Sequence, residues 1–246
     1  MAALRQEVEE QANTFIMESL PTLIEATKQN NLATVRLLLE SGQEIDQQDE
    51  NGWTALHWAV FYSYEDMVEL LVESGADISI RDNSGQPIIF KAASNGNLDI
   101  LDYLVENGAS VNAYIDSPEY MGFTVLMRAV LEGHEEMTEY LLEDGAEVNA
   151  RMSGSDFEGW TALCGAVLSG SLDIVQNLVE AGAMINVEVV SGDLVGMTPF
   201  TLAVGNNDLD IASYLYEQGS DLERELTTGL TVYQTAMRIA EAEEYT

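Results

Sequence analysis

Residues 54–75 read TALHWAVFYSYEDMVELLVESG, and both ends of this stretch recur along the chain. The opening TALHWA returns in altered form as PTLIEA, PIIFKA, TVLMRA, TALCGA and TPFTLA, which begin at Pro21, Pro87, Thr124, Thr161 and Thr198. The closing glycine lies 21 residues after each opening, at Gly42, Gly75, Gly108, Gly145, Gly182 and Gly219. Two markers therefore keep one register through six copies, with periods of 33, 33, 37, 37 and 37 residues. Periods of this size are typical of repeat proteins that stack their units.

The residues within one copy predict two short helices. Thr or Pro suits the start of the first helix, and an alanine such as Ala59 lets neighbouring helices approach closely. In residues 67–74, MVELLVES, apolar side chains recur at helical spacing, and the glycine that follows suits the left-handed conformation at a helix end. Each copy is therefore predicted to be a helix, a turn, a helix and an extended link. No copy buries its apolar face alone, so stability has to come from stacking.

These copies resemble the ankyrin-repeat family, which has a period of 33 and the signature T-P-L-H-x-A. The segment Thr54-Ala55-Leu56-His57 comes closest to that signature, and Thr198-Pro199-Phe200-Thr201 keeps its proline. The resemblance spans roughly residues 20–236. It implies an all-α solenoid of six helix-turn-helix repeats with hairpin-like links and a capping helix at each end. Proteins of this family usually bind other proteins on their concave side.

The register predicts a single domain over residues 1–246. Its predicted parts are an N-terminal cap helix at 1–19, repeats at 20–48, 49–81, 82–118, 119–155, 156–192 and 193–226, and a truncated C-terminal cap at 227–246. An apolar stripe that includes Leu4 and Val8 predicts the first cap, and an opening at Thr231 predicts the last.

The longer periods place four extra residues in the links at 114–121, 151–158 and 187–195. Our hypothesis is that these three adjacent links lengthen one wall of a binding groove. The alternative is neutral drift, because loops accept insertions at little entropic cost.

Large apolar residues recur where each link should meet the concave side. The position before five of the openings holds Trp53, Gln86, Phe123, Trp160 and Met197, of which all but Gln86 are large and apolar. The ends of the first helices add residues such as Leu131 and Leu168. Exposed apolar side chains in such a stripe are typical of a recognition surface. We predict these partner-binding residues: Trp53, Phe61, Tyr62, Tyr120, Met121, Phe123, Phe157, Trp160, Leu194 and Met197. The alternative for the aromatic residues is a scaffold role, in which each packs against the next link.

The chain has 43 acidic and nine basic residues, so its formal net charge is −34. Such a surface repels nucleic acid and anionic membrane and favours the approach of a basic protein. Acids such as Glu69, Asp102 and Glu139 are predicted on a solvated outer face of the second helices. Solubility does not require so large a charge, which leaves a basic partner or a high-salt environment as explanations.

Nothing in the sequence indicates catalysis. His57 stands where the family resemblance implies structural hydrogen bonds, and the lone Cys164 takes the same place in its copy and is predicted to be a small core residue. No zinc-type spacing, calcium loop or phosphate-binding glycine motif occurs. We therefore predict no enzyme activity, no catalytic residue, no cofactor and no metal.

A single cysteine cannot form an internal disulfide, and no uncharged stretch is long enough to cross a membrane, so we expect a cytoplasmic protein that is monomeric when unbound. The predicted function is non-catalytic binding of a basic protein through the concave face, as a stand-alone inhibitor or immunity-type protein. Two alternatives stay open. They are an adaptor or scaffold that tethers a partner without inhibiting it, and a regulatory subunit of an enzyme assembly.

Overall fold

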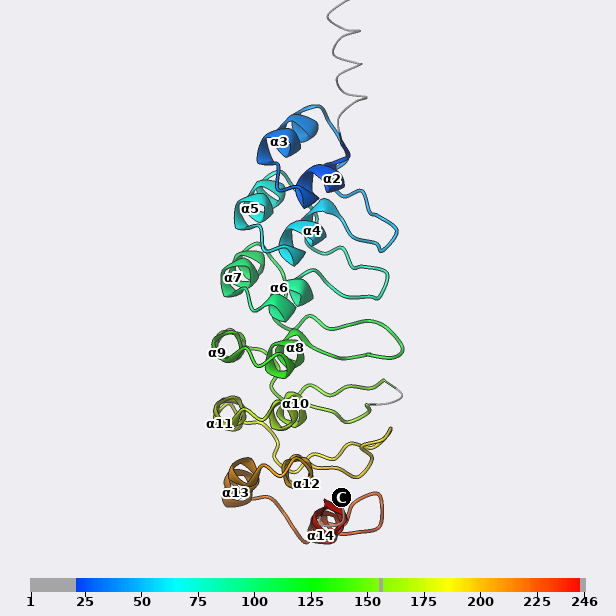
Figure 1. Ribbon diagram of the computed structural model, residues 1–246, viewed down its shortest axis with the longest axis vertical. Coiled ribbons are helices and arrows are strands. Elements are labelled where there is room, and N and C mark those ends of the chain that lie inside the picture. The colour runs from blue at the N-terminus through cyan, green and yellow to red at the C-terminus, as the bar shows by residue number, and fades with distance from the viewer. Residues whose placement is uncertain (1–20, 155–156, 244–246) are drawn as a thin grey trace, which may run out of the picture. The chain divides into compact units, whose positions relative to one another are not determined.

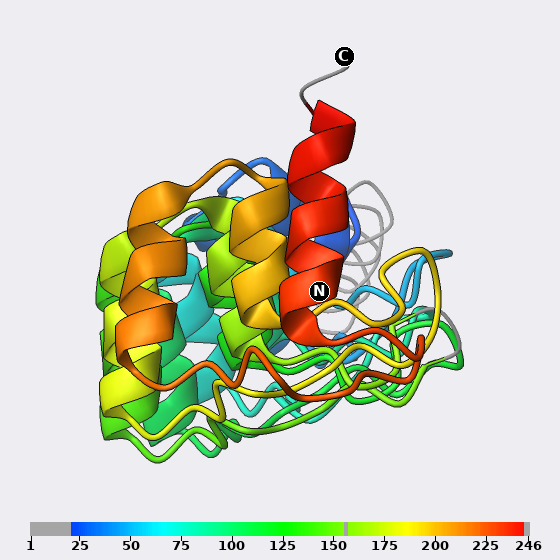
Figure 2. The ribbon, with the colours of Figure 1, turned by 90° about the horizontal axis from the view of Figure 1, so that it is seen from below.

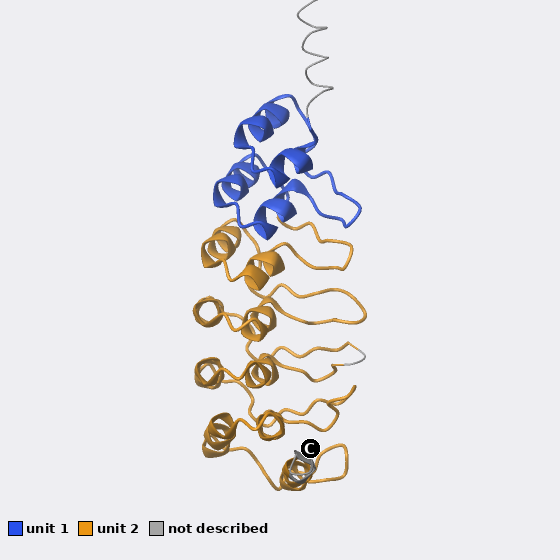
Figure 3. Ribbon diagram, viewed as in Figure 1, with its two compact units in different colours: residues 1–77 blue, residues 78–246 orange. Residues whose placement is uncertain are grey.

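The computed structural model describes residues 21–154 and 157–243 of the chain. The predicted N-terminal cap helix at 1–19 lies outside these residues. The described residues form thirteen α-helices, joined alternately by tight turns and longer links. They fall into two compact units, of which unit 1 ends at Asp77 and unit 2 begins at Ile78 (Figure 3).

Unit 1 contains two helix pairs (Figure 1). Its helices are α2 (Leu23–Lys28), α3 (Leu32–Glu40), α4 (Ala55–Phe61) and α5 (Glu65–Glu73). The first helices α2 and α4 contact each other, as do the second helices α3 and α5. Ala26 and Ala59 are fully buried, so the small side chains predicted for close helix packing lie where stacking needs them.

Unit 2 contains four helix pairs and a closing helix. Its helices are α6 (Ile89–Asn95), α7 (Leu98–Glu106), α8 (Val125–Leu131), α9 (Glu135–Glu143), α10 (Ala162–Ser169), α11 (Leu172–Glu180), α12 (Pro199–Gly205), α13 (Leu209–Glu217) and α14 (Val232–Glu243). Each first helix contacts the next, from α6 through α8, α10 and α12 to α14. Seen along the stack in Figure 2, unit 2 has three layers: second helices, first helices and links.

Threonine side chains start most of the first helices. The Thr54 hydroxyl accepts a hydrogen bond from the backbone N–H of His57, and the His57 ring in turn lies within hydrogen-bond distance of the Thr54 backbone N–H, which makes a capping box. Thr22, one residue after the Pro21 that opens its copy, caps α2, and Pro87 lies two residues before α6, which has no side-chain cap. Thr or Pro therefore marks the start of each first helix, and where a side chain caps such a start, it is Thr. Thr161, at the start of α10, makes no side-chain cap.

The second helices end as predicted. Each of the six is nine residues long, and a glycine with positive φ follows two residues after its end. In the first of them, the backbone N–H of Gln43 bonds to the carbonyl of Leu38 across Gly42, which has a φ of 83°. This is the turn that a glycine favours at a helix C-terminus.

The links are hairpins. In unit 2, Arg81 pairs with Pro87, Tyr114 with Thr124 and Glu225 with Thr231 in isolated antiparallel bridges. The predicted all-α architecture of helix-turn-helix repeats with hairpin-like links is thus confirmed. The C-terminal cap predicted from the opening at Thr231 is the single helix α14, and the Thr231 hydroxyl caps it by accepting from the backbone N–H of Gln234 at 3.2 Å.

Candidate protein interface

A groove of about 490 Å³ lies between the links and first helices of unit 2. It is lined by Gln86, Ile115, Tyr120, Phe123, Arg128, Leu131, Met152, Phe157, Trp160, Leu168 and Leu194. The links contribute most of these residues, and α8 and α10 contribute three. Five of the ten predicted binding residues meet here: Tyr120, Phe123, Phe157, Trp160 and Leu194.

The groove has a buried floor and an exposed rim. Phe123 and Trp160 are only 6% and 4% exposed, because neighbouring links and first helices cover them. Tyr120 and Phe157 are 47% and 37% exposed, and the Phe157 ring meets the edge of Trp160 at a centroid distance of 6.2 Å. The floor therefore mainly packs the repeats together, which is the scaffold role that the sequence left open. The apolar surface open to a partner comes from the rim.

Arg128 is the only cation among the described residues that line the groove. Its guanidinium lies 5.0 Å from the centre of the Phe123 ring, and its Nη1 lies 3.2 Å from Glu132 Oε1. Its Nε–H has no exposed surface and no hydrogen-bond partner in the described structure. Glu132 thus offsets the one positive charge in a mostly apolar lining. The sequence analysis missed Arg128, although a charged residue at the fifth position of an opening, where other copies hold residues such as Trp58 and Leu202, was a signal that could have found it.

Two of the predicted binding residues in unit 2 do not line the groove. The carbonyl of Met121 accepts a hydrogen bond from the backbone N–H of Ser153 at 2.9 Å, which ties one link to the next. The Met197 sulfur lies 3.8 Å from the Thr201 hydroxyl, over the start of α12. Their part in binding stays a prediction.

The other three predicted residues, Trp53, Phe61 and Tyr62, lie in unit 1. With Trp58 and Tyr64 they form one continuous set of ring contacts, which we call the aromatic cluster. The Trp53 and Trp58 rings are 4.6 Å apart, and Tyr62 stacks on Trp58 at 5.7 Å. Phe61 and Tyr62 are each more than 40% exposed. The sequence analysis missed Trp58 and Tyr64.

Trp58 is held between a carboxylate and an ammonium. Its indole N–H donates to Asp49 Oδ2 at 2.9 Å, and the Lys28 ammonium lies 3.8 Å from the centre of its ring. Asp49 Oδ1 also accepts from the backbone N–H groups of Asn51 and Trp53. Burial alone raises the pKa of Asp49, but these hydrogen bonds and the nearby Lys28 charge outweigh it, so the pKa lies below its ordinary value. The Asp49 carboxylate is therefore charged, and its hydrogen bond holds the Trp58 ring in place within the aromatic cluster.

The residues that could suggest catalysis have structural contacts instead. His57 is buried in its capping box, and the His134 ring lies 3.4 Å from the carbonyl oxygen of Ser94. Burial raises the pKa of the Cys164 thiol, which sits 3.5 Å from the Thr161 hydroxyl. Among the described residues, no three His, Cys, Asp or Glu side chains are grouped to hold a metal ion.

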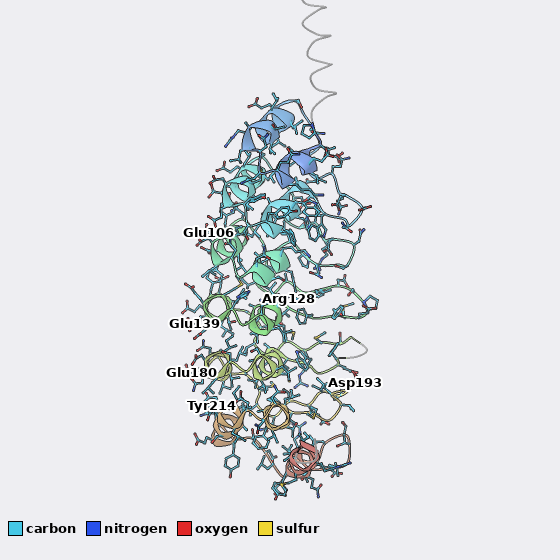
Figure 4. All side chains as sticks on the ribbon, viewed as in Figure 1. Glu106, Arg128, Glu139, Glu180, Asp193 and Tyr214 are labelled. Atoms are coloured by element: carbon cyan, nitrogen blue, oxygen red, sulfur yellow. The ribbon has the colours of Figure 1, made fainter. Side chains whose placement is uncertain are left out.

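The acids of the second helices lie on the side away from the links. Figure 4 shows Glu106, Glu139 and Glu180 of unit 2 pointing outward, whereas Arg128 lies between its helix and the links. Two of these outer acids also join neighbouring repeats: Asp102 accepts from the Tyr140 hydroxyl at 2.7 Å, and Glu139 accepts from the Asn177 amide at 3.0 Å. Part of the outer face is therefore scaffold as well as solvated surface.

Stacked helix pairs, hairpin links and a mostly apolar groove beneath the links define a helical repeat protein with a surface suited to binding. Comparison with known families identifies the type of repeat. A sequence model described as ankyrin repeats, three copies, matches residues 5–82, 78–152 and 151–225. The chain belongs to the ankyrin-repeat family, as the resemblance of its openings to T-P-L-H-x-A predicted. Ankyrin repeats bind protein partners, so the chain is a protein–protein interaction module.

No helix in the described part of the chain is both long and apolar enough to span a bilayer.

Two curated proteins are similar over a short stretch. Protein phosphatase 1 regulatory subunit 27 of Mus musculus is 42% identical over 55 residues, which cover 22% of this chain and 36% of that protein. The Homo sapiens protein of the same name is 43% identical over 54 residues, covering 22% and 35%. The match thus spans about a third of the length of these relatives.

Solved structures show the same fold over most of the chain. The ankyrin repeat domain of Bcl-3, described as a unique member of the IkappaB protein family, has a TM-score of 0.72 and 28% identity, with 92% of this chain and 99% of that chain covered. The human ASB11 ankyrin repeat domain has a TM-score of 0.68 and 23% identity, with 89% and 97% covered. These likenesses establish the ankyrin-repeat solenoid fold.

Proposed function

We propose that the chain is a non-catalytic protein that binds a basic protein partner through its concave face, with the groove of unit 2 as the main contact. In this proposal the protein acts in the cytoplasm, is monomeric when unbound, and folds as one domain with the repeat boundaries given above. The observation that carries the proposal is the groove itself, in which exposed Tyr120, Phe157 and Leu168 surround about 490 Å³ of mostly apolar space.

The exposed rim supports protein binding by a simple physical argument. Apolar surface left in contact with water costs free energy, and a partner that covers it recovers that energy on binding. Aromatic side chains at the centre of an interface carry a large share of the binding energy. Tyr120 and Phe157 offer such rings above a packed floor, so they need little reordering when a partner arrives.

Charge supports a basic partner. A formal net charge of −34 attracts a positively charged protein over a distance set by the ionic strength. Glu132 pairs with Arg128 and offsets its charge, so the one cation that lines the groove is a weak obstacle to such a partner. We therefore propose that the acidic surface accelerates encounter and that the apolar rim holds the complex.

Binding in a groove also suits an inhibitor or immunity-type protein, because a partner held there has part of its own surface covered. A second candidate function is that of a regulatory subunit of an enzyme assembly. The similarity to a protein phosphatase 1 regulatory subunit favours this candidate, within the 22% of the chain that the match covers. An adaptor that tethers a partner without changing its activity is the remaining alternative.

The test uses two baits, the parent chain and the double variant Tyr120→Ala/Phe157→Ala, in a lysate of cells that express the protein. A partner of the groove is captured by the parent and lost with the variant. Its association rate, measured with purified proteins, should fall by about tenfold or more between about 20 mM and about 500 mM salt. A partner captured equally by both baits, or an association rate that salt leaves unchanged, contradicts the proposal.

The activity of the captured partner separates the candidates. A stoichiometric loss of the partner's activity when the chain is added indicates an inhibitor. A changed substrate preference in a stable complex indicates a regulatory subunit. Unchanged activity indicates an adaptor.

A further inference from the structure

The aromatic cluster of unit 1 already holds one cation. The ammonium of Lys28, at the end of α2, lies 3.8 Å from the centre of the Trp58 ring on α4. The face of an aromatic ring carries partial negative charge, and tryptophan attracts cations most strongly of the aromatic residues. The cluster therefore has the chemistry of a cation site, and its own lysine is seen at it.

The surroundings of Trp58 strengthen this attraction. Asp49 accepts the indole N–H at 2.9 Å, which adds a carboxylate at the ring edge and lets the indole polarise toward it. Three backbone and side-chain hydrogen bonds, together with the Lys28 charge, hold the pKa of Asp49 below its ordinary value despite burial, so the carboxylate is charged at neutral pH. Tyr62 stacks on Trp58 and presents an exposed ring beside it.

Lys28 is a weak occupant of this site. Its side chain is exposed, and an ammonium on a flexible exposed stem gains little from a single cation–π contact in water. A partner whose other side chains are already bound can place a second cation over the same rings at a smaller entropic cost. The internal contact is therefore easily displaced.

We propose that the aromatic cluster of unit 1 binds a lysine or arginine side chain of the protein partner, which takes the place of the Lys28 ammonium on Trp58. This inference rests on the proposed function for the existence of a basic partner. It adds the kind of side chain recognised and a second contact surface, in unit 1. Lys28 acts as an internal competitor that keeps the rings covered until the partner arrives.

The test follows the indole N–H signals of the chain by NMR. The sequence has three tryptophans, Trp53, Trp58 and Trp160, so single Trp→Phe variants assign each signal. The probe is hexalysine amide, and its control is the same peptide with every side-chain amine acetylated, which removes the charge and keeps the chain length. Hexaarginine distinguishes a guanidinium from an ammonium.

The expected result is a saturable shift of the Trp58 signal with hexalysine or hexaarginine and none with the acetylated peptide. Trp160, at the floor of the unit 2 groove, reports any peptide bound there instead, and its signal should shift less than that of Trp58. A Trp58 signal that stays still, or that moves no further than Trp160, overturns the proposal.

A matched pair of variants separates the ring contact from general charge. Lys28→Met uncovers Trp58, and Arg36→Met removes the same charge from an exposed site on α3. Hexalysine should bind Lys28→Met at least about threefold more tightly than Arg36→Met, because only the former loses a competitor for the ring. Equal affinities of hexalysine for the two variants would show that Lys28 does not compete with the peptide for the Trp58 ring.

The cation site and the proposed function can be contradicted separately. If the peptides do not bind at Trp58 but Tyr120→Ala/Phe157→Ala still loses its partner, the groove stands and the cation site falls. If the peptides bind as expected but the groove variant keeps its partner, the groove is wrong and unit 1 is the place of recognition.

Discussion

The guanidinium of Arg128 lies 5.0 Å from the centre of the Phe123 ring, at the floor of the unit 2 groove. The contact joins a residue of α8 to the link that precedes it, and Glu132 pairs with the same guanidinium at 3.2 Å. A positive charge at this place opposes a basic partner, and its buried Nε–H is left without a hydrogen bond.

Arg128→Met should fold normally and bind a basic partner more tightly, by about threefold, because a like charge leaves the interface. Its free energy of unfolding should stay within about 1 kcal/mol of the parent, since an exposed ion pair contributes little and an unpaired buried N–H is removed. Calorimetric titration and urea unfolding measure the two effects. Arg151→Met, at an exposed position outside the groove lining, is the control. A tenfold loss of affinity in Arg128→Met alone would mean that the partner places a carboxylate there.

Trp160→Ala should damage the fold more than any rim substitution. The side chain is 4% exposed, and truncating a large buried aromatic residue typically costs about 3–5 kcal/mol. Phe157→Ala, on the rim above it, should cost about 1 kcal/mol. Thermal and urea unfolding of both variants give the comparison. Equal losses would mean that Trp160 is not the packed floor of the groove.

Gly159 is required by its link in two ways. Its φ is +88°, and a Cβ there would lie 2.5 Å from the carbonyl oxygen of Glu188 in the next link. Gly145 has a φ of +85°, and apart from its neighbours in the chain no residue comes within 4 Å of its Cβ position. Both alanine variants lose about 1 kcal/mol to backbone strain, but Gly159→Ala should lose about 2 kcal/mol more through the clash. Unfolding curves that coincide would show that the links do not pack as described.

Asp82 should make part of the stability depend on pH. It is 8% exposed and accepts from the Ser84 hydroxyl at 2.6 Å and the backbone N–H of Gln86 at 3.0 Å. Burial alone raises its pKa, but these hydrogen bonds and the Lys91 charge lower it overall from the ordinary value of 3.8. The carboxylate therefore stabilises the fold above the unfolded-state pKa, and this stabilisation is lost as pH falls through the lower folded-state pKa.

The measurement is the difference in free energy of unfolding between the parent and Asp82→Asn. It should be constant above about pH 5 and shrink as the pH is lowered below the ordinary pKa of Asp82. Asp144→Asn, which changes an exposed carboxyl at the end of α9, controls for general charge. If this difference in free energy of unfolding does not change with pH, the charged form of Asp82 does not contribute to the stability of the fold.

The repeats could be predicted because their requirements are local. Gly145 has to adopt a positive φ two residues after a helix, and Thr54 has to accept the backbone N–H of the residue three positions later. Each of these conformational requirements restricts one position of the copy to a few residue types. Six copies with the same spacing therefore predict the helices and their order. The sequence does not single out the cap of α2, because Pro21 and Thr22 both suit a helix start.

The candidate surfaces were only partly predictable because they depend on contacts between copies. The sequence places Trp160 and Phe157 in one link, but burial of the first and exposure of the second follow from packing against neighbouring links. Likewise, the Lys28 and Trp58 side chains are 30 residues apart in the chain and meet only because α2 packs on α4. A repeat pattern predicts where a side chain lies within its own copy. It does not predict whether the neighbouring copy buries that side chain.

The central claim is that the exposed rim of the unit 2 groove holds the partner. The most direct measurement is the dissociation constant of the purified partner for Tyr120→Ala/Phe157→Ala, beside Glu136→Gln/Glu143→Gln on the outer face of α9. Circular dichroism of each variant confirms that it is folded. We predict that the rim variant loses about 30-fold or more in affinity, equivalent to about 2 kcal/mol, and that the outer-face variant changes by less than about threefold. Normal binding by a folded rim variant, together with loss of binding in the outer-face variant, would contradict the account and move recognition to the acidic second helices.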